Sequence, residues 1–204
     1  MRQNIINPEQ SYTFSDYFKM RISTEDIVNY FGYSKENARL QLPSSKIDLP
    51  VLSNLFAIIE DALLHISLEN EITRREFLIA PVMAEVRRLT NSKLRSEYWF
   101  EFNHQLKGSL DYFLRSEHNL LVIEAKDADM TRGFTQLSTE MIALDKADDT
   151  DQKIIYGAIT TGNIWQFGKL ERMSKIISQD IKNFDLIEDL EILVRILVGI
   201  LEEK

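Results

Sequence analysis

The spacing of apolar residues changes near Asn91, and this change limits the folds open to the chain more than any other feature. Before Asn91, apolar residues recur at helical spacing over residues 51–67 and again over 71–89, which predicts two helices. Pro81 is expected to kink the second helix, because its ring blocks a regular helical hydrogen bond. After Asn91 the apolar residues alternate, which is typical of strands. The chain is therefore expected to pack helices against a sheet.

The alternating region predicts three short strands, at residues 98–106, 110–114 and 120–126. Turn-forming residues separate them, with Gly108 in the first connection and the polar run 116–119 in the second. Strands joined by such short connections form an antiparallel meander.

Helical and strand patterns both occur in the rest of the chain. Apolar residues at helical spacing predict a helix over 130–147 and another over 184–201. Between them, two strands at 153–160 and 164–170 are separated by the turn 161–163, which predicts a hairpin.

The N-terminal part is less regular. A short helix is predicted over 23–33, with Ser23 as its capping residue, and residues 32–50 read as a connection. We therefore expect an N-terminal helical extension over 1–50 and one domain over 51–204. The expected fold class of that domain is α/β (α+β), in the order helix, three-stranded meander, helix, strand pair and closing helix.

The composition excludes several kinds of site. The 204 residues include no Cys, which rules out disulfides, thiolate metal ligands and a Cys nucleophile. His65, His104 and His118 lie on different predicted elements, so a His-based site is not expected. The formal net charge of -8 argues against a protein that coats DNA through bulk electrostatics, but it leaves room for a small basic patch beside metal-binding carboxylates.

Neither a signal peptide nor a membrane span is expected. Residues 1–10 are polar, and the most apolar segment, 186–201, is too short and too charged to cross a bilayer. A cytoplasmic protein without a membrane partner is expected.

The strongest candidate for a chemical site lies at the end of the predicted strand 120–126. Alternation places Glu124 and Lys126 on the same face of that strand. Asp111 lies thirteen residues before Glu124, in the preceding strand. Antiparallel pairing of the two strands is expected to bring these carboxylates side by side.

Two carboxylates beside a Lys suit Mg²⁺-dependent hydrolysis of a phosphodiester. Mg²⁺ prefers oxygen ligands and is usually held by one or two carboxylates, with waters and phosphate oxygens completing its shell. We expect Asp111, Glu124 and the Ala125 carbonyl to supply the protein ligands, and Mn²⁺ to substitute for Mg²⁺. Lys126 is expected to orient the attacking water or to neutralise charge in the transition state. The pKa of Lys126 should depend on a balance, because nearby carboxylates raise it and burial lowers it.

The short pattern acidic-x-Lys is weak evidence by itself. It also occurs at 151–153, 180–182 and 202–204, but none of these ends an apolar strand that is preceded by a second carboxylate strand. The apolar strand before Glu124 and the carboxylate of the preceding strand distinguish residues 124–126 from these other three occurrences. The alternative interpretation is a surface ion pair beside a strand-terminal Asp.

Residues 71–170 resemble the PD-(D/E)XK nuclease fold, whose core runs helix, three-stranded meander, helix, strand. The local sequence is similar to the nuclease domain of type I restriction enzyme motor subunits and its stand-alone relatives. The similar pieces are residues 70–74, 79–82, 111–112, 122–126 and 136–137. Leu110 stands where the family motif has its proline. The resemblance implies that Asp111 and Glu124 bind the metal and that Lys126 is catalytic.

The resemblance also implies a metal-binding carboxylate from the first helix. Glu71 and Glu85 are the two candidates, and only one can reach the metal, because 14 residues of ideal helix span roughly 21 Å. Glu71 is preferred because the family places this residue near the start of the helix. Glu85, close to Arg87 and Arg88, is then expected on a solvated face.

Two residues of the predicted helix 130–147 are further candidates, because Gln136 matches a residue of the family and Gly133 lies close to it. Gln136 matches a glutamine that contacts the site or the substrate in some relatives, and the alternative is an exposed helix glutamine. Gly133 either permits a close approach of a backbone or phosphate, or is simply a tolerated glycine.

The expected function is that of a Mg²⁺-dependent nuclease acting on DNA in restriction or repair. The alternative is a non-catalytic nucleic-acid-binding or assembly module on the same fold, and a third class is a pure interaction protein. Trp165 and Phe167 are expected in the core rather than as base-stacking platforms. The densest basic region is expected either to contact phosphate or to form a solvated helix face, and it comprises Arg74, Arg75, Arg87, Arg88, Lys93 and Arg95.

The last predicted helix is apolar on both sides. Leu190, Leu193 and Leu197 follow one stripe, while Val194 and Val198 make the other side apolar as well. A single buried stripe needs only one apolar side. A homodimer to which this helix contributes is therefore expected.

Overall fold

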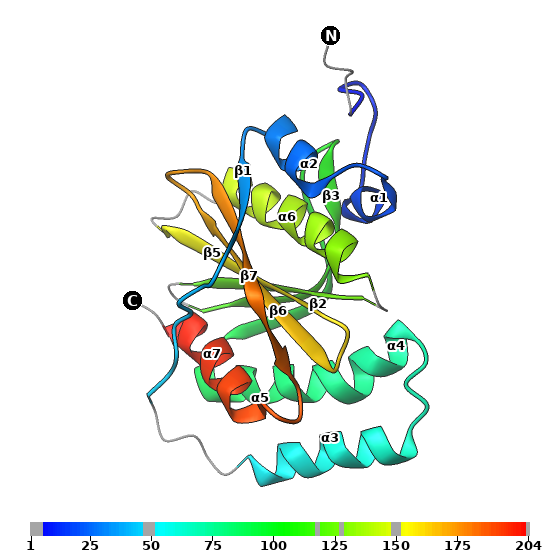
Figure 1. Ribbon diagram of the computed structural model, residues 1–204, viewed down its shortest axis with the longest axis vertical. Helices are drawn as coiled ribbons and strands as arrows, with labels where there is room; N and C mark the ends of the chain where they lie inside the picture. The colour runs from blue at the N-terminus through cyan, green and yellow to red at the C-terminus, as the bar shows by residue number, and fades with distance from the viewer. Residues whose placement is uncertain (1–5, 47–51, 117–118, 127–128, 148–151, 203–204) are drawn as a thin grey trace.

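The computed structural model describes residues 6–46, 52–116, 119–126, 129–147 and 152–202, which form one mixed sheet with helices on both faces (Figure 1). The strands are β1 (Ser34–Ala38), β2 (Lys93–Asn103), β3 (Leu106–Arg115), β4 (Leu120–Ala125), β5 (Ile154–Thr160), β6 (Ile164–Glu171) and β7 (Ile176–Asp185). The helices are α1 (Phe14–Lys19), α2 (Thr24–Tyr30), α3 (Ser53–His65), α4 (Glu71–Arg74), the π-helical turn η1 (Arg75–Ile79), α5 (Ala80–Thr90), α6 (Met130–Ala147) and α7 (Leu190–Glu202).

The seven strands are ordered β1-β7-β6-β5-β4-β3-β2 across the sheet. β2, β3 and β4 form an antiparallel meander, β4 pairs with β5 in parallel, and β5, β6 and β7 are antiparallel. The predicted mixed α/β class, the meander and the hairpin of β5 and β6 are confirmed. The predicted turn at Gly108 is wrong, because β2 ends at Asn103 and Gly108 lies within β3, paired with Phe100 and packed against Phe14.

Two strands were not expected, and the predictions over their residues are wrong in part. β1 lies inside the predicted connection 32–50, and β7 runs to Asp185, so the last helix begins at Leu190 instead of residue 184. Neither strand has a regular apolar alternation, since β1 reads Ser-Lys-Glu-Asn-Ala and the middle of β7 is polar. β1 is held at the edge of the sheet by parallel pairing with β7 and not by an apolar face of its own.

The predicted kink at Pro81 takes the form of a π-helical turn. η1 separates α4 from α5, and Pro81 lies at the start of α5, directly after the π-helical turn. π-Helical turns inside helices are frequent at functional sites. Here the turn carries Arg75, which reaches the candidate site described below.

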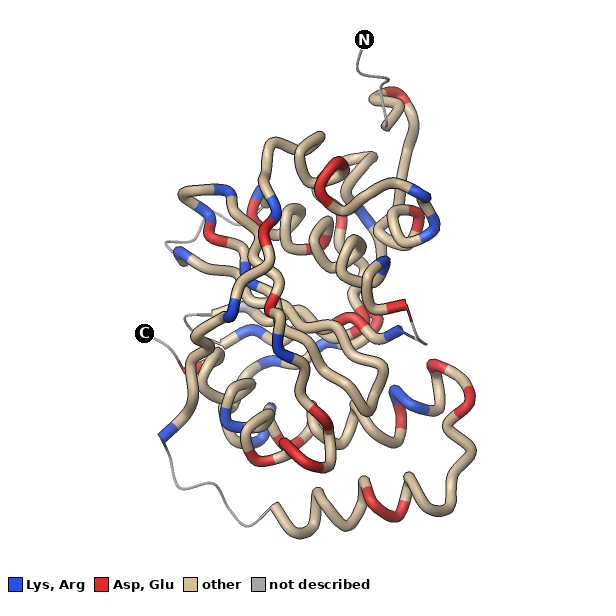
Figure 2. The backbone as a smooth tube through the Cα atoms, in the orientation of Figure 1, with Lys and Arg blue, Asp and Glu red and all other residues tan. Residues whose placement is uncertain are grey.

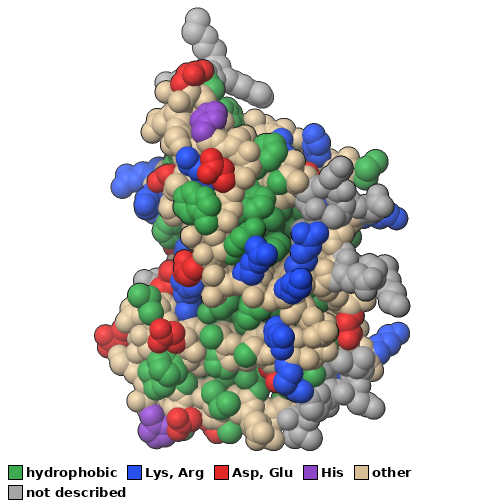
Figure 3. Space-filling view, turned by 180° about the vertical axis from the view of Figure 1, so that it is seen from behind, with side chains coloured by type: hydrophobic (Ala, Val, Ile, Leu, Met, Phe, Trp, Pro, Cys, Tyr) green, Lys and Arg blue, Asp and Glu red, His purple; other side chains and the backbone are tan. Residues whose placement is uncertain are grey.

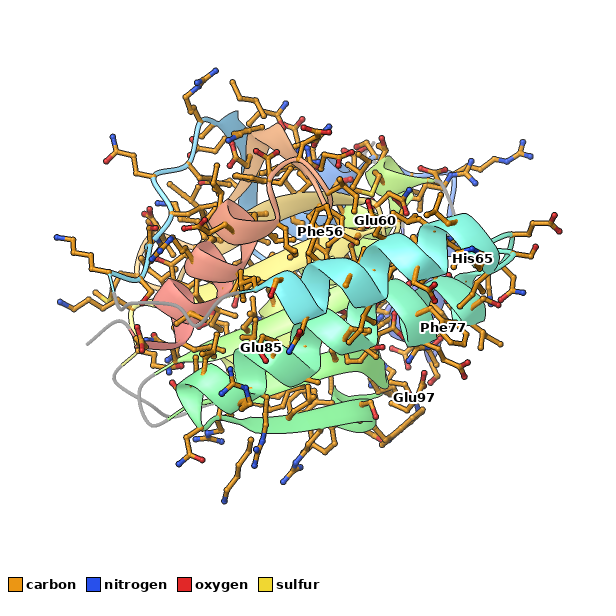
Figure 4. The ribbon with its side chains drawn as sticks, turned by 90° about the horizontal axis from the view of Figure 1, so that it is seen from below. Phe56, Glu60, His65, Phe77, Glu85 and Glu97 are labelled. Carbon is orange, nitrogen blue, oxygen red and sulfur yellow. The ribbon has the colours of Figure 1, made fainter. Side chains whose placement is uncertain are left out.

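Two apolar layers enclose the sheet. α1, α2 and α6 cover one face, and α5 and α7 cover the other, with α3 packed outside α5 (Figure 1). Figure 4 shows α3 as the outermost helix when the molecule is seen from below. Trp165 and Phe167 are fully buried in the layer beneath α5 and α7, which confirms that both are core residues.

The predicted N-terminal extension contains the two short helices α1 and α2, but it also contains the sheet strand β1 and contributes to the main core. Ser23 caps α2 by accepting a hydrogen bond from the Asp26 amide at 3.1 Å. Phe14, Val28 and Tyr33 belong to the same apolar cluster as α6. The expected boundary at residue 50 lies outside the described residues.

The alternation of β3 reverses at Asp111. Leu110 packs in the layer under α6, whereas Tyr112 packs in the layer under α5, although a regular strand would place both side chains on the same face. Opposite this point, Glu97 of β2 has a left-handed backbone with φ of 49°. The pairing register of the two strands is the same on either side, with Tyr112 opposite Ser96 and Leu110 opposite Tyr98. β3 pairs with β4 only over residues 112–115, so Asp111 lies where these strands separate.

Both sides of α7 are covered by the chain itself. One side packs on the sheet and α5, and Gly199 lies against the backbone of residues 43–45. The Ser45 amide also donates a hydrogen bond to the Arg195 carbonyl at 2.9 Å. The second apolar side, which motivated the expected homodimer, therefore has a partner within the chain, and the homodimer stays a prediction. No described helix is long and apolar enough to cross a membrane.

The contact at Gly199 can be tested by adding one methyl group. A Cβ there would lie 2.7 Å from the Ser45 nitrogen and 2.8 Å from the Pro43 carbonyl carbon, so one backbone segment has to move. We expect Gly199→Ala to lower the free energy of unfolding by about 1–3 kcal/mol. On an exposed helix the same change would raise stability by about 1 kcal/mol.

Urea unfolding followed by circular dichroism measures this difference. Ile192→Ala on the same helix serves as the control, because a side chain that is 47% exposed should cost about 1 kcal/mol or less. A stabilising Gly199→Ala would show that residues 43–45 do not cover α7.

Candidate active site

Asp111 and Glu124 lie side by side where β3 separates from β4. The pairing of Tyr112 with Ile123 puts Asp111 opposite Glu124 when the register is continued by one residue. Beyond that pair the Ala125 amide has no partner on β3, and a buried N–H requires an acceptor. Asp111 Oδ2 accepts its hydrogen bond at 2.8 Å. The Asp111 carboxylate thus lies beside the residue that follows Glu124, close enough for its charge to raise the pKa of Glu124.

Lys126 lies on the same side of the sheet as Glu124 and forms an ion pair with Glu124 Oε1. The Lys126 side chain is largely buried, and its ammonium group is 5.1 Å from the centre of the Phe18 ring in α1. Figure 2 shows acidic and basic positions close together where the end of β4 approaches the start of α6.

Gly133 allows α6 to close on this part of the sheet. A Cβ at Gly133 would lie 1.9 Å from Ile159 Cδ1 and 2.9 Å from Lys126 Cγ. The glycine is therefore required by a close approach, but the approaching groups are two side chains of this protein.

Helix α6 adds Gln136 and Glu140 to the site. Gln136 Nε2 donates hydrogen bonds to Glu124 Oε1 at 2.6 Å and to Glu140 Oε1 at 3.0 Å. Gln136 is 4% exposed, so the alternative of an exposed helix glutamine is wrong. Glu140 was not predicted, although a signal for it exists: it lies one turn after Gln136, inside the apolar stripe of the helix.

Three buried oxygen atoms of this cluster accept no hydrogen bond from an N–H or alcohol O–H group among the described residues, although the carboxyl groups of Glu124 and Glu140 also interact directly with each other. They are Glu124 Oε2, Gln136 Oε1 and Glu140 Oε2. A buried acceptor without a donor costs about 1–3 kcal/mol, and more when it carries charge. Such a set of oxygen atoms suits a hard cation.

Arg75 of η1 binds the other side of Asp111. Its Nη1 atom is 3.3 Å from Asp111 Oδ1 and 2.5 Å from Glu97 Oε1, and its guanidinium lies 5.5 Å from the centre of the Tyr112 ring. The left-handed backbone of Glu97 occurs directly across from Asp111. Neither Arg75 nor Glu97 was predicted to contact Asp111, because nothing in the sequence places η1 against the reversal in β3.

Burial dominates the electrostatics of the carboxylates. It raises the pKa of Asp111, and Arg75 and the Ala125 amide offset this rise only in part. Burial raises the pKa of Glu124 well above its ordinary value, and the neighbouring Glu140 and Asp111 raise it further. The pKa of Glu140 is raised to about 7, also chiefly by burial.

The pKa of Lys126 follows the expected balance. Burial lowers it, but the attraction of Glu124, Asp111 and Glu71 outweighs burial, so the net shift is upward. Lys126 is therefore a charged ammonium at neutral pH, suited to donating hydrogen bonds and not to acting as a base.

The two candidates for the helix carboxylate occupy different surroundings. Glu71 is the first residue of α4 and lies close enough to Lys126 to raise its pKa. Glu85 lies on α5 (Figure 4) and accepts hydrogen bonds from Arg88 at 2.6 and 3.0 Å. These contacts favour Glu71 as the member of the site.

The donor set is compatible with Mg²⁺. No group of three or more His, Cys, Asp or Glu side chains among the described residues forms a ready-made metal site. Mg²⁺ does not require one, since it commonly keeps several waters and takes one or two carboxylates. Asp111, Glu124 and Gln136 Oε1, which accepts no hydrogen bond from the described residues, provide oxygen atoms of the right kind.

The two described histidines, His65 and His104, make contacts elsewhere. His65 pairs with Asp61 at 3.0 Å, and His104 contacts the Pro8 carbonyl at 3.0 Å. His118 lies outside the described residues.

The buried Glu124 and Glu140 pair makes stability depend on pH. Because the pKa of Glu140 is about 7 in the folded chain and 4.5 ordinarily, the folded state keeps a proton that the unfolded state releases between these values. This contribution to stability is fully present below about pH 4.5 and is lost as the pH rises to 7. Glu140→Gln keeps the shape without titrating, so its stability relative to wild type should rise by about 1 kcal/mol for each pH unit in this window.

Urea unfolding in EDTA at a series of pH values checks this expectation. Glu85→Gln is the matched control, because the hydrogen bond from Arg88 lowers the pKa of Glu85, so this variant should gain nothing over the same window. A stability difference between Glu140→Gln and wild type that does not change with pH would contradict the assigned environment.

A comparison with protein-family models gives no match, and a comparison with curated proteins gives none either. What this site can do therefore follows from its own residues and geometry.

Proposed function

We propose that the chain is a Mg²⁺-dependent nuclease of the PD-(D/E)XK kind, which hydrolyses phosphodiester bonds of DNA in restriction or repair. One observation carries the proposal: Asp111 and Glu124 lie side by side at the separation of β3 and β4, with Lys126 paired to Glu124. The restriction endonuclease-like arrangement of the core is part of this proposal. It is supported by the order of α4 to α5, the meander, α6 and β5.

Asp111, Glu124 and the Ala125 carbonyl would hold the metal, with Glu71 as a further candidate. When bound, Mg²⁺ lowers the pKa of a water and stabilises the charge that develops on the scissile phosphate. Gln136 keeps Glu124 oriented by donating to Glu124 Oε1, and Glu124 also lies against the carboxyl group of Glu140. A bound cation would offset the repulsion between these buried carboxylates, which supports Glu124 as a metal ligand.

Lys126 supplies a positive hydrogen-bond donor next to the metal ligands. Its ammonium group pairs with Glu124 and is attracted by Asp111 and Glu71, and burial would strengthen its interaction with a bound phosphate. A fixed donor of this kind stabilises developing negative charge in the transition state. Arg75 holds Asp111 in place and offsets part of the negative charge of the cluster.

A substitution of Lys126 should slow cleavage without weakening metal binding. Removing Lys126 leaves buried Glu124 without its ion pair, which is destabilising, so Lys126→Gln is preferred over Lys126→Ala. We expect Lys126→Gln to bind Mg²⁺ or Mn²⁺ as well as wild type or better, and to cleave about 10²- to 10³-fold more slowly. Lys126→Arg should restore little, because a planar fork replaces a compact ammonium.

Calorimetric titration with Mn²⁺ and cleavage of plasmid and single-stranded DNA provide the two readouts. Asp111→Asn should lose both metal binding and cleavage. Lys169→Gln, which removes an ion-paired lysine from β6, should keep both. If Lys126→Gln cleaves as fast as wild type, the proposed site is not the active one. Metal binding by wild type without any cleavage would favour the non-catalytic module.

A further inference from the structure

A second feature of the same sheet face is a basic pocket at the β2 edge, which the proposed nuclease site does not use. It has a volume of about 210 Å³ and lies between β2, the end of β3 and the last turn of α6. We call it the basic pocket, and its lining residues are Lys93, Arg95, Tyr98, Phe100, Phe113, Arg115, Leu144 and Ala147.

Three cations surround the basic pocket, and no Asp or Glu is among its described lining residues. Lys93, Arg95 and Arg115 are all exposed, on a chain whose formal net charge is -8. Lys93 and Arg115 are directly paired across β2 and β3. Like charges in such a pair destabilise a sheet, and a bound anion would relieve their repulsion.

The base of the basic pocket is aromatic. The rings of Tyr98 and Phe113 are stacked, with centroids 5.6 Å apart and an interplanar angle of 23°. Phe100 lies beside Tyr98, and the Arg95 guanidinium lies 4.5 Å from the centre of the Tyr98 ring. Aromatic rings beside cations match a ligand that combines a flat base with a phosphate.

The basic pocket is close to the proposed nuclease site along two elements. Phe113 follows Asp111 by two residues on β3, about 7 Å along a strand. Leu144 follows Glu140 by four residues on α6, about 6 Å along a helix. The face opposite to that of Figure 1 carries a band of Lys and Arg side chains interleaved with hydrophobic ones (Figure 3).

We propose that the basic pocket binds one nucleotide of a single-stranded nucleic acid and thereby directs a single strand to Asp111 and Glu124. The direction of the strand to that site rests on the proposed function, but binding in the basic pocket does not require metal or turnover. A single strand is favoured over a duplex for two reasons. Duplex bases are stacked on each other and cannot enter a pocket singly, and the pocket volume suits one base and not a helix.

The test is fluorescence anisotropy of a short labelled oligonucleotide, with the full chain in EDTA so that no cleavage occurs. Wild type should bind a single strand more tightly than the matching duplex, with an affinity that falls as salt is raised. Arg115→Ala should weaken binding and reduce the salt slope by about 1. Arg95→Ala should cost at least about fivefold in affinity, since it removes both a charge and the cation stacked on Tyr98.

Arg39→Ala is the matched control, because exposed Arg39 follows β1 at the opposite edge of the sheet and its loss should leave affinity unchanged. Single-stranded DNA and single-stranded RNA are compared to identify the sugar. Equal binding of single strand and duplex, or equal losses for all three Arg variants, would overturn the proposal. Binding that depends on Arg95 and Arg115 without any metal-dependent cleavage would retain the basic pocket and reject the nuclease. Cleavage that does not depend on either residue would retain the nuclease and overturn the proposal that the basic pocket directs the strand to it.

Discussion

The hydrogen bond from the Ala125 amide to Asp111 spans the point where β3 separates from β4, and the geometry of the candidate site depends on it. It satisfies a buried N–H that has lost its strand partner, and it fixes one oxygen of Asp111. The other oxygen of Asp111 is left to Arg75. The reversal of β3, with left-handed Glu97 opposite, creates this opening without disturbing the pairing of β2 and β3 on either side.

The opening concentrates charge that the fold has to stabilise. Glu124 and Glu140 are buried, and burial raises the pKa of both. Lys126 and Gln136 contact Glu124 but leave oxygen atoms of the cluster without donors. These buried charged groups lower the stability of the fold locally, and groups that cost stability often cluster at functional sites. Residues 43–45 against α7 and the two apolar layers provide the surrounding rigidity.

The parts of the site that were predictable are those encoded by strand and helix periodicity. Alternation put Glu124 and Lys126 on one face, short connections implied the meander that brings Asp111 to Glu124, and a clear apolar stripe gave the bounds of α6. β1 and β7 escaped prediction because their pairing rests on backbone hydrogen bonds and not on an apolar pattern. Arg75 and Glu97 escaped it because their contact with Asp111 depends on a π-helical turn and a strand reversal, which have no periodic signal. Glu140 could have been predicted, because a charged residue within the apolar stripe of α6 indicates a buried polar contact.

The central claim is that Asp111 and Glu124 share a divalent cation. The most direct measurement is anomalous diffraction from crystals of the protein soaked in Mn²⁺. We predict one peak between the carboxylates of Asp111 and Glu124, and its loss in Asp111→Asn crystals. Well-diffracting crystals in which Arg75 still binds Asp111 and no peak appears at millimolar Mn²⁺ would contradict it.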